Sequence, residues 1–249
     1  MFRFEDGKMN LGDYTLVQKF GPDVLNVTCL YPEFIMVKTN EMVDAYRSRL
    51  EGKTIGSLLE VGIQKGGSVV LFNEMLKPQR HMGVDIIRHE GGLDTYVERT
   101  SSPGREIHIR YDISQSEPDA IVNAWKDRFG EDPVFDIVID DASHNYDLSL
   151  PTFNGLFKYV APGGVYAIED WAWAHWDDFQ NPDNQEYPNR ALSNLIIYCV
   201  LAAATGKSGI ARVDVTPDTV FVHRDMNSVP DNLDIETAFL TRGREYTHL

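Results

Sequence analysis

The sequence predicts an α/β fold with a mostly parallel, twisted β-sheet and a C-terminal antiparallel hairpin. Three observations support this prediction. Short apolar runs alternate with helical segments from residue 57 to residue 170, a pattern typical of parallel strands joined by right-handed crossovers. The apolar runs at 134–140 and 165–169 end in acidic residues. Residues 210–215 and 219–223 flank the turn signal Thr216-Pro217-Asp218, which predicts the closing hairpin.

The composition limits the class of protein. With 249 residues and 43% hydrophobic content, the chain can form one α/β domain with additions. A net charge of −15 argues against nucleic acid and membrane partners, because both need clustered Lys and Arg. Cys29 and Cys199 form no disulfide framework. The acidic N-terminus is unlike a signal peptide, and the apolar stretch 195–204 is too short to span a membrane. These features predict a soluble, cytoplasmic protein.

Residues 1–40 have no clear helical or strand period and are interpreted as an extension packed on the domain or on a neighbouring subunit. They carry apolar side chains without a domain of their own to bury them, and a patch of that size usually marks an interface. These side chains belong to Leu16, Val17, Phe20, Leu25, Val27, Leu30, Phe34 and Ile35. We therefore predict a homo-oligomer. The predicted organisation is an extension at 1–40, a domain at 41–225 and a tail at 226–249.

The first helix is expected at 41–50, and a buried strand follows at 57–62. A glycine-containing turn then leads into a helix at 69–76. This order is the geometry of a nucleotide-type cofactor site, because glycines let the backbone approach a ligand and the helix N-terminus offers free N–H groups. The spacing of Gly62, Gly66 and Gly67 does not match the dinucleotide fingerprint, which disfavours a nicotinamide cofactor. An ordinary tight turn between strand and helix is the alternative.

The next two strands also end in polar residues. The strand at 82–85 ends in Asp85, 25 residues after Glu60, where such folds place a carboxylate that binds ribose. The strand at 106–111 leads to Asp112 and Gln115, a polar rim suited to the edge of an adenine ring.

The second half of the chain continues the alternation. We expect helices at 120–129, 149–160 and 189–204 around the strands at 134–140 and 165–169. Residues 171–188 break the pattern, and three of the four tryptophans lie within six residues there. This segment is too polar to be core throughout, so a lid over a site is predicted; core packing is the alternative for any one tryptophan.

The two acidic strand ends bring Asp140, Asp141, Glu169 and Asp170 to one rim of the sheet, with His144 just beyond. Four carboxylates at one rim repel each other unless a cation lies between them. A hard metal ion such as Mg²⁺ is the simplest such cation. Because neighbouring residues in a strand point to opposite faces, Asp140 and Asp141 should have different roles. We assign Asp140 to the cofactor side.

Taken together, these motifs resemble the class I S-adenosylmethionine (SAM)-dependent methyltransferases. More narrowly, they resemble the metal-dependent sugar O-methyltransferases of antibiotic biosynthesis, including those acting on macrolide and enediyne deoxysugars. The cephalosporin-hydroxylase-like proteins share the metal pattern. The resemblance covers roughly residues 55–175 and rests on Glu60-Val-Gly62, Gly66-Gly67-Ser68, Asp85, Asp112, Asp141-Ala-Ser-His144 and Glu169-Asp170. Its most specific element is the Asp-x-x-His motif, followed 28 residues after the aspartate by Glu-Asp-Trp.

The resemblance implies a Rossmann-like class I methyltransferase domain at 41–225, with the lid as an insertion. It implies Asp141, Glu169 and Asp170 as ligands of Mg²⁺ or Mn²⁺ and His144 as the general base. Together with the strand-end positions, it indicates the residues that bind SAM, which are Glu60, Gly62, Gly66, Ser68, Asp85, Asp112, Gln115 and Asp140. The implied reaction is methyl transfer from SAM to a sugar hydroxyl of a small glycosylated natural product.

Elementary chemistry is consistent with this function. Coordination of two vicinal hydroxyls to Mg²⁺ lowers the pKa of the reacting one, and a histidine titrates near neutral pH, where general-base catalysis is efficient. His144 could instead be a metal ligand, which would favour Zn²⁺, Mn²⁺ or Fe²⁺, or only a helix cap. The alternative substrates are a catechol-like or other small diol. The alternative function is a non-catalytic SAM-binding accessory protein.

Overall fold

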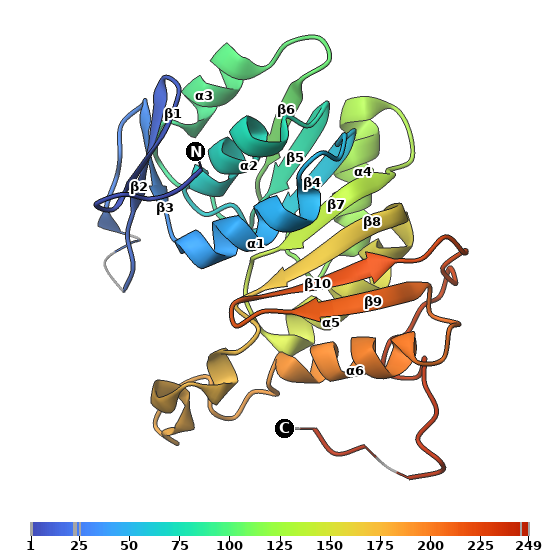
Figure 1. Cartoon of the computed structure of the whole chain (residues 1–249). Coiled ribbons are helices and arrows are strands. Elements are labelled where there is room, and N and C mark those ends of the chain that lie inside the picture. The colour runs from blue at the N-terminus through green and yellow to red at the C-terminus, as the bar shows by residue number, and fades with distance from the viewer. Residues whose placement is uncertain (1, 22–23, 25, 245, 249) are drawn as a thin grey trace. The chain divides into compact units, whose positions relative to one another are not determined.

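The computed structural model describes residues 2–21, 24, 26–244 and 246–248 (Figure 1). Leu25, one of the apolar residues assigned to an interface, lies outside them. The chain divides into two compact units, Met1–Asp112 and Ile113–Leu249, and the domain limits given above stay a prediction. Among the described residues, no helix combines the length and the apolar character needed to cross a bilayer. The cytoplasmic location also stays a prediction.

Unit 1 contains three parallel strands in the order β6-β5-β4. They are β4 (Ser57–Val61), β5 (Arg80–Val84) and β6 (Glu106–Arg110), and the helices are α1 (Asn40–Leu50), α2 (Gly67–Leu76) and α3 (Leu93–Thr100). The apolar runs in β4 and β5 are buried almost throughout, as strands covered on both faces require. Helix α1 begins after Thr39, whose side chain accepts a hydrogen bond from the Met42 N–H. The strands predicted at 57–62, 82–85 and 106–111 and the helices predicted at 41–50 and 69–76 are confirmed.

Unit 1 also contains a small N-terminal sheet that was not predicted from the sequence. Its strands are β1 (Lys8–Leu11), β2 (Tyr14–Gln18) and β3 (Glu33–Met36), in the order β1-β2-β3. The β1–β2 pair is antiparallel, and β3 runs parallel to β2. In Figure 1 these blue strands lie beside α3. The extension is therefore folded on its own unit.

The predicted interface rested on the premise that the apolar side chains of residues 1–40 are not buried within their own chain. This packing shows that the premise is wrong for several of them. Leu16, Phe34 and Ile35 are at most 3% exposed, and the first two join a buried cluster with residues of α2 and α3 such as Val70 and Tyr96. This burial could not be predicted from the sequence, because the strands are too short for a clear period. The large apolar side chains that stay exposed in the described part of the extension include Phe20 and Leu30, at 55% and 78%.

The glycine turn before α2 is shaped by packing as well as by backbone conformation. Gly66 has a φ of +80°, a left-handed conformation that favours glycine. A Cβ atom built on Gly67 would lie 1.9 Å from the carbonyl oxygen of Ile35 in β3. Because that oxygen belongs to the backbone of a paired strand, it cannot easily move. The absence of a side chain at Gly67 thus lets the N-terminal sheet approach α2.

We expect the substitution Gly67→Ala to destabilise the protein by about 1–3 kcal/mol or more, the range for forcing extra volume into a packed interior. Urea unfolding followed by circular dichroism measures this change. Gly91→Ala is the matched control, because a Cβ atom at Gly91 would meet only the carbonyl oxygen of Cys29, at 3.9 Å. Equal unfolding midpoints for the two variants would contradict the close approach.

Unit 2 contains four strands in the order β7-β8-β10-β9. Strands β7 (Phe135–Asp140) and β8 (Val160–Glu169) are parallel, and β10 (Thr219–Arg224) pairs antiparallel with both β8 and β9 (Ile210–Val215). The predicted parallel pair and C-terminal hairpin are thus confirmed. The helices of this unit are α4 (Pro118–Phe129), α5 (Tyr146–Leu156) and α6 (Ser193–Ala203), with short 3-10 turns at Phe157–Tyr159, Trp173–His175 and Asp177–Gln180.

One helix of unit 2 differs from its predicted limits in a way that matters for the site. Helix α5 begins at Tyr146 rather than at residue 149, because the Asn145 side chain caps it by accepting a hydrogen bond from the Asp147 N–H. The start of α5 therefore lies directly after His144.

Candidate active site

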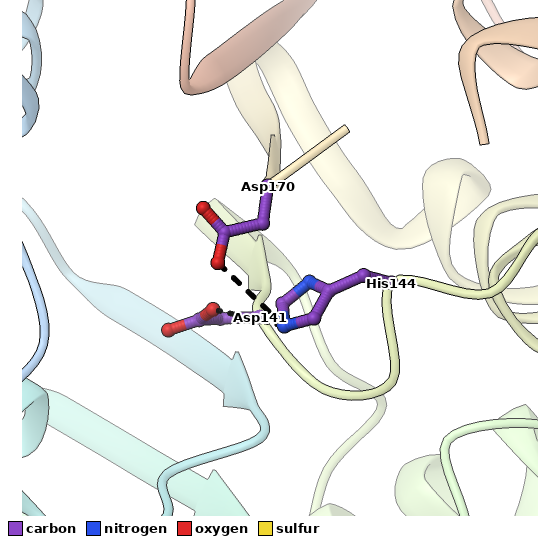
Figure 2. Close-up of side chains that lie close together, drawn as sticks. All are labelled: Asp141, His144 and Asp170. Carbon is purple, nitrogen blue, oxygen red and sulfur yellow. Dashed lines mark ion pairs between the residues drawn. The ribbon is translucent and has the colours of Figure 1, made fainter. Parts of the chain in front are cut away.

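The C-terminal ends of β7 and β8 bring Asp141, His144 and Asp170 together (Figure 2). The Nε2 atom of His144 lies 4.0 Å from Asp141 Oδ1 and 3.8 Å from Asp170 Oδ2. One ligand atom from each residue lies within 4.8 Å of the others. The three side chains point toward one another in Figure 2, and each is 12–26% exposed. Two of the four predicted rim carboxylates, Asp141 and Asp170, thus form a compact, partly exposed cluster with His144, whereas Asp140 and Glu169 are buried.

The backbone of β7 and β8 explains why the residues after the two strands lie close together. In the parallel pair, Asp140 of β7 lies opposite Ile168 of β8, so the two strands end at the same level. The chain then turns sharply, with φ values of +55° at His144 and +52° at Asp170. Asp and His adopt this region more readily than most residues, although it still costs about 1–3 kcal/mol. Such strain is concentrated at functional sites.

Hydrogen bonds fix the turn between Asp141 and α5. The Gln115 side chain accepts a hydrogen bond from the Ser143 N–H at 2.9 Å, and the Ser143 hydroxyl accepts one from the Asn145 N–H at 3.2 Å. Residues on both sides of His144 are therefore held. On the other strand, the Asp170 N–H donates to the carbonyl of Asp218 at 2.8 Å, which ties this residue to the β9–β10 turn.

The neighbouring carboxylates Asp140 and Asp141 have different environments, and their different roles stay a prediction. Asp140 is 3% exposed and accepts hydrogen bonds from the Tyr166 hydroxyl at 3.0 Å and from the Gln115 amide at 3.3 Å. Burial raises the pKa of Asp140 to about 7, against the opposing effect of the Tyr166 hydrogen bond. Both Gln115 and Asp140 thus hydrogen-bond within the chain. Their predicted contacts with a cofactor stay a prediction.

Glu169 lies outside the cluster. It is the last residue of β8 and only 1% exposed, whereas Asp170, the next residue, has left the strand. The groups that could hold a metal in the described part of the chain comprise Asp141, His144 and Asp170 and do not include Glu169. The role of Glu169 as a ligand stays a prediction.

The cluster fits a small divalent cation. It offers two carboxylates, which are hard oxygen donors of the kind that Mg²⁺ prefers, and an imidazole that Mn²⁺ also accepts. Its partial exposure leaves positions for water or substrate oxygens. The distances of 3.8 and 4.0 Å from His144 to the carboxylates are too long for direct hydrogen bonds. The arrangement is therefore consistent with His144 acting either as a base or as a third ligand.

The predicted cofactor residues of unit 1 form an ordered loop after β4. Gly62 has a φ of +89°, and its N–H donates to the Val84 carbonyl at 2.9 Å. Asp85 accepts hydrogen bonds from the N–H groups of Ile63 and Gln64 at 3.0 and 2.8 Å. This carboxylate therefore holds the loop in shape, whatever else it binds.

Two further predicted cofactor residues of unit 1 differ in exposure. Ser68 is buried in the first turn of α2, and Asp112 is exposed with a φ of +62°. Binding of SAM by these residues stays a prediction.

Glu60 occupies a different environment from the one expected of a cofactor ligand. It is fully buried, and its Oε2 atom lies 3.3 Å from Nε2 of His81, which is also fully buried. The other ring nitrogen of His81 lies 2.6 Å from the Asn73 amide. The contacts of Glu60 with His81 and of His81 with Asn73 could not be predicted, because contacts between neighbouring strands and a helix leave no local pattern in the sequence. The binding role of Glu60 stays a prediction.

The segment at 171–188 places an aromatic cluster next to the base candidate. The Trp173 ring centroid lies 4.3 Å from that of His144, 6.2 Å from that of Trp176 and 5.8 Å from that of Phe179. The Trp171 indole N–H donates to the Thr216 carbonyl at 2.9 Å. In Figure 1 this segment projects beyond the ends of β8 and β10. Trp176 is 47% exposed, so the cluster presents an apolar surface to solvent.

Comparison with known proteins finds local similarity to sugar O-methyltransferases of macrolide biosynthesis. No family model matches the chain. The demethylmacrocin O-methyltransferase of Streptomyces fradiae is 51% identical over 45 residues, which are 18% of this chain and 11% of the relative. The mycinamicin VI 2''-O-methyltransferase of Micromonospora griseorubida is 45% identical over 62 residues, 24% of this chain and 16% of the relative. Both matches are local.

A solved structure gives a longer match. MycE methyltransferase from the mycinamycin biosynthetic pathway, in complex with Mg, SAH and mycinamycin VI, has a TM-score of 0.53 and 25% identity. The superposition covers 75% of this chain and 49% of MycE, so the chain spans about half the length of that relative. These similarities confirm the resemblance to the sugar O-methyltransferases of macrolide biosynthesis, and they show that the chain has the Rossmann-like fold of the class I methyltransferases.

Proposed function

We propose that the chain is an O-methyltransferase that transfers a methyl group from SAM to a sugar hydroxyl of a glycosylated natural product with the help of Mg²⁺ or Mn²⁺. The observation that carries the proposal is the cluster of Asp141, His144 and Asp170 at the strand ends of a class I methyltransferase fold. The names of the relatives support the substrate class, and the Mg and SAH bound to MycE support the cofactors.

In this proposal Asp141 and Asp170 hold the ion. When bound, the ion would lower the pKa of a coordinated hydroxyl and orient it. His144 then accepts the hydroxyl proton while the oxygen forms a bond to the methyl carbon. The bond from that carbon to sulfur breaks, which leaves S-adenosylhomocysteine. The Trp173 ring, whose centroid lies 4.3 Å from that of His144, packs against the imidazole and limits its movement, as proton transfer to a positioned base requires.

The aromatic cluster of Trp173, Trp176 and Phe179 supports a substrate with a flat apolar face. The C–H face of a sugar and the ring of a catechol-like diol can both stack on such side chains, so the diol stays the alternative substrate. A non-catalytic SAM-binding protein is the weaker alternative. It would have no use for left-handed backbone at His144 and Asp170, which costs free energy and brings two acids and a base together.

The proposal is tested by a labelled-methyl assay with SAM against a panel of glycosylated natural products and simple catechols. We expect transfer to a glycoside that is lost in excess chelator and restored by Mg²⁺ or Mn²⁺, because the carboxylate donors suit these ions. Transfer to catechols alone would favour the alternative substrate. Full activity in excess chelator would exclude the metal role.

We also propose a homo-oligomer. Fewer apolar side chains of the N-terminal extension support it than were expected from the sequence, because several of them are buried within unit 1. Phe20 and Leu30 are exposed apolar side chains of the N-terminal extension, and such side chains can be covered by a second copy. Light scattering at micromolar concentration should then give at least twice the mass of one chain, and Leu30→Asp should shift the equilibrium toward monomers. A single-chain mass for the unsubstituted protein would refute this proposal.

A further inference from the structure

A polar cluster in unit 2 connects the start of α5 with the residues that follow the lid and with the C-terminal tail. Tyr146 is fully buried, and its hydroxyl donates to Glu236 Oε1 at 2.7 Å. The Arg190 guanidinium lies 4.4 Å from the centroid of the Tyr146 ring and 3.7 Å from Glu236 Oε1. Arg190 also pairs with Asp147. Four side chains from three segments thus contact one another.

The tail holds Glu236 in a defined place. The Ile235 N–H donates to the Asn154 side chain of α5 at 3.0 Å, and Ile235 itself is fully buried. The Asp234 side chain accepts a hydrogen bond from the Glu236 N–H at 3.2 Å. The tail therefore contacts α5 through Tyr146 in its first turn and through Asn154 in its third.

This cluster reaches His144 along two routes. Tyr146 follows His144 by two residues, and only the capping residue Asn145 lies between them. His144 has a strained backbone, so it needs support from the residues that flank it. Arg190 follows the predicted lid at 171–188 by two residues, and the Trp173 ring of that segment contacts the imidazole of His144. The backbone of His144 is thus directly continuous with the helix start that contacts Glu236, and the segment that packs on its ring leads along the chain to Arg190.

We propose that Glu236 is a positioning residue that, through Tyr146 and Arg190, holds the turn carrying His144 and anchors the end of the lid. Its effect on catalysis rests on the proposed function, whereas its effect on the turn does not. A carboxylate hydrogen bond to a buried hydroxyl is stronger than a neutral one, so its loss should loosen the first turn of α5.

Hydrogen–deuterium exchange on the full chain tests the turn directly. The amides of Leu148 and Ser149 both donate to the Asn145 carbonyl and report opening of the first turn. We expect Glu236→Ala to speed their exchange by roughly tenfold, the usual effect of losing one such bond. Glu236→Gln, which keeps an acceptor for Tyr146, should stay within about threefold of the unsubstituted protein. Asp231→Ala removes an exposed acid from the same tail and should change nothing.

Kinetics with the same variants tests the catalytic consequence. Glu236→Ala should lower kcat by about tenfold with a nearly unchanged KM for SAM, and Glu236→Gln should restore most of the loss. If Glu236→Ala does not fold, Tyr146→Phe, which removes only the hydroxyl, should still speed exchange by about threefold or more. Unchanged exchange at Leu148 and Ser149 in the folded variants would overturn the proposal, as would an equal effect of Asp231→Ala. Absence of methyl transfer by the unsubstituted protein would overturn the proposed function alone, since the exchange results stand without it.

Discussion

Asp141→Asn is expected to lower the rate of methyl transfer by roughly 10²–10⁴-fold, because a bound cation contributes several kcal/mol to transition-state stabilisation and each 1.36 kcal/mol is a factor of ten. Asparagine keeps the size of the side chain but removes the charge that the cation needs. SAM affinity should change little, since the proposed cofactor residues do not include Asp141. Calorimetric titration with Mn²⁺ and with SAM separates the two effects. Asp127→Asn, the same change at an exposed position on α4, should keep normal kinetics.

Calorimetric titration with Mn²⁺ of variants at Glu169 and Asp170 decides which of these two acids, the last residue of β8 or the one after it, holds the ion. The sequence resemblance implies both as ligands, but only Asp170 belongs to the cluster with Asp141. If the metal site consists of the cluster without Glu169, Asp170→Asn should weaken Mn²⁺ binding strongly and Glu169→Gln should weaken it much less. Equal losses of Mn²⁺ affinity in the two variants would indicate that Glu169 is also a ligand. Normal Mn²⁺ affinity in both Asp141→Asn and Asp170→Asn would exclude the site.

The parts of the fold that the sequence predicted correctly share one physical cause. A strand buried on both faces must be apolar along its whole length, so β7 and β8 are visible as continuous runs, and their acidic ends mark where burial stops. The positions of Asp141, His144 and Asp170 follow from that rule together with the parallel pairing. The positions of these three residues can therefore be inferred without knowing which distant segments contact one another.

The parts that were missed depend on contacts between distant segments. The N-terminal strands span four or five residues each, which is too short for a period of two to stand out. The pairing of Glu60 with His81 is set by neighbouring strands, and that of Tyr146 with Glu236 joins residues 90 positions apart. Such pairs have no spacing rule, so a single sequence cannot show that Glu60 faces a histidine or that the tail contacts α5.

His144→Ala is expected to lower kcat by roughly 10²–10⁴-fold, the usual contribution of a positioned general base. SAM affinity should be nearly unchanged, because His144 lies with the carboxylates and not among the proposed cofactor residues. Raising the pH should restore part of the rate, since hydroxide can then remove the proton from the substrate hydroxyl. The measurement is kcat as a function of pH, repeated at several concentrations of Mg²⁺.

The two other roles left open for His144 predict different results for the same variant. If the imidazole is a metal ligand, as its 3.8 and 4.0 Å distances from the carboxylates allow, the variant loses affinity for Mn²⁺, and added metal rather than alkali restores the rate. If the residue only supports the start of α5, its loss destabilises the protein by about 1 kcal/mol, the scale of a helix cap, and kcat survives. The Asn145 side chain already caps α5, which leaves little for His144 to do in that role. A near-normal kcat for His144→Ala at neutral pH would therefore exclude the base, and a fall in kcat with unchanged Mn²⁺ affinity would exclude the ligand.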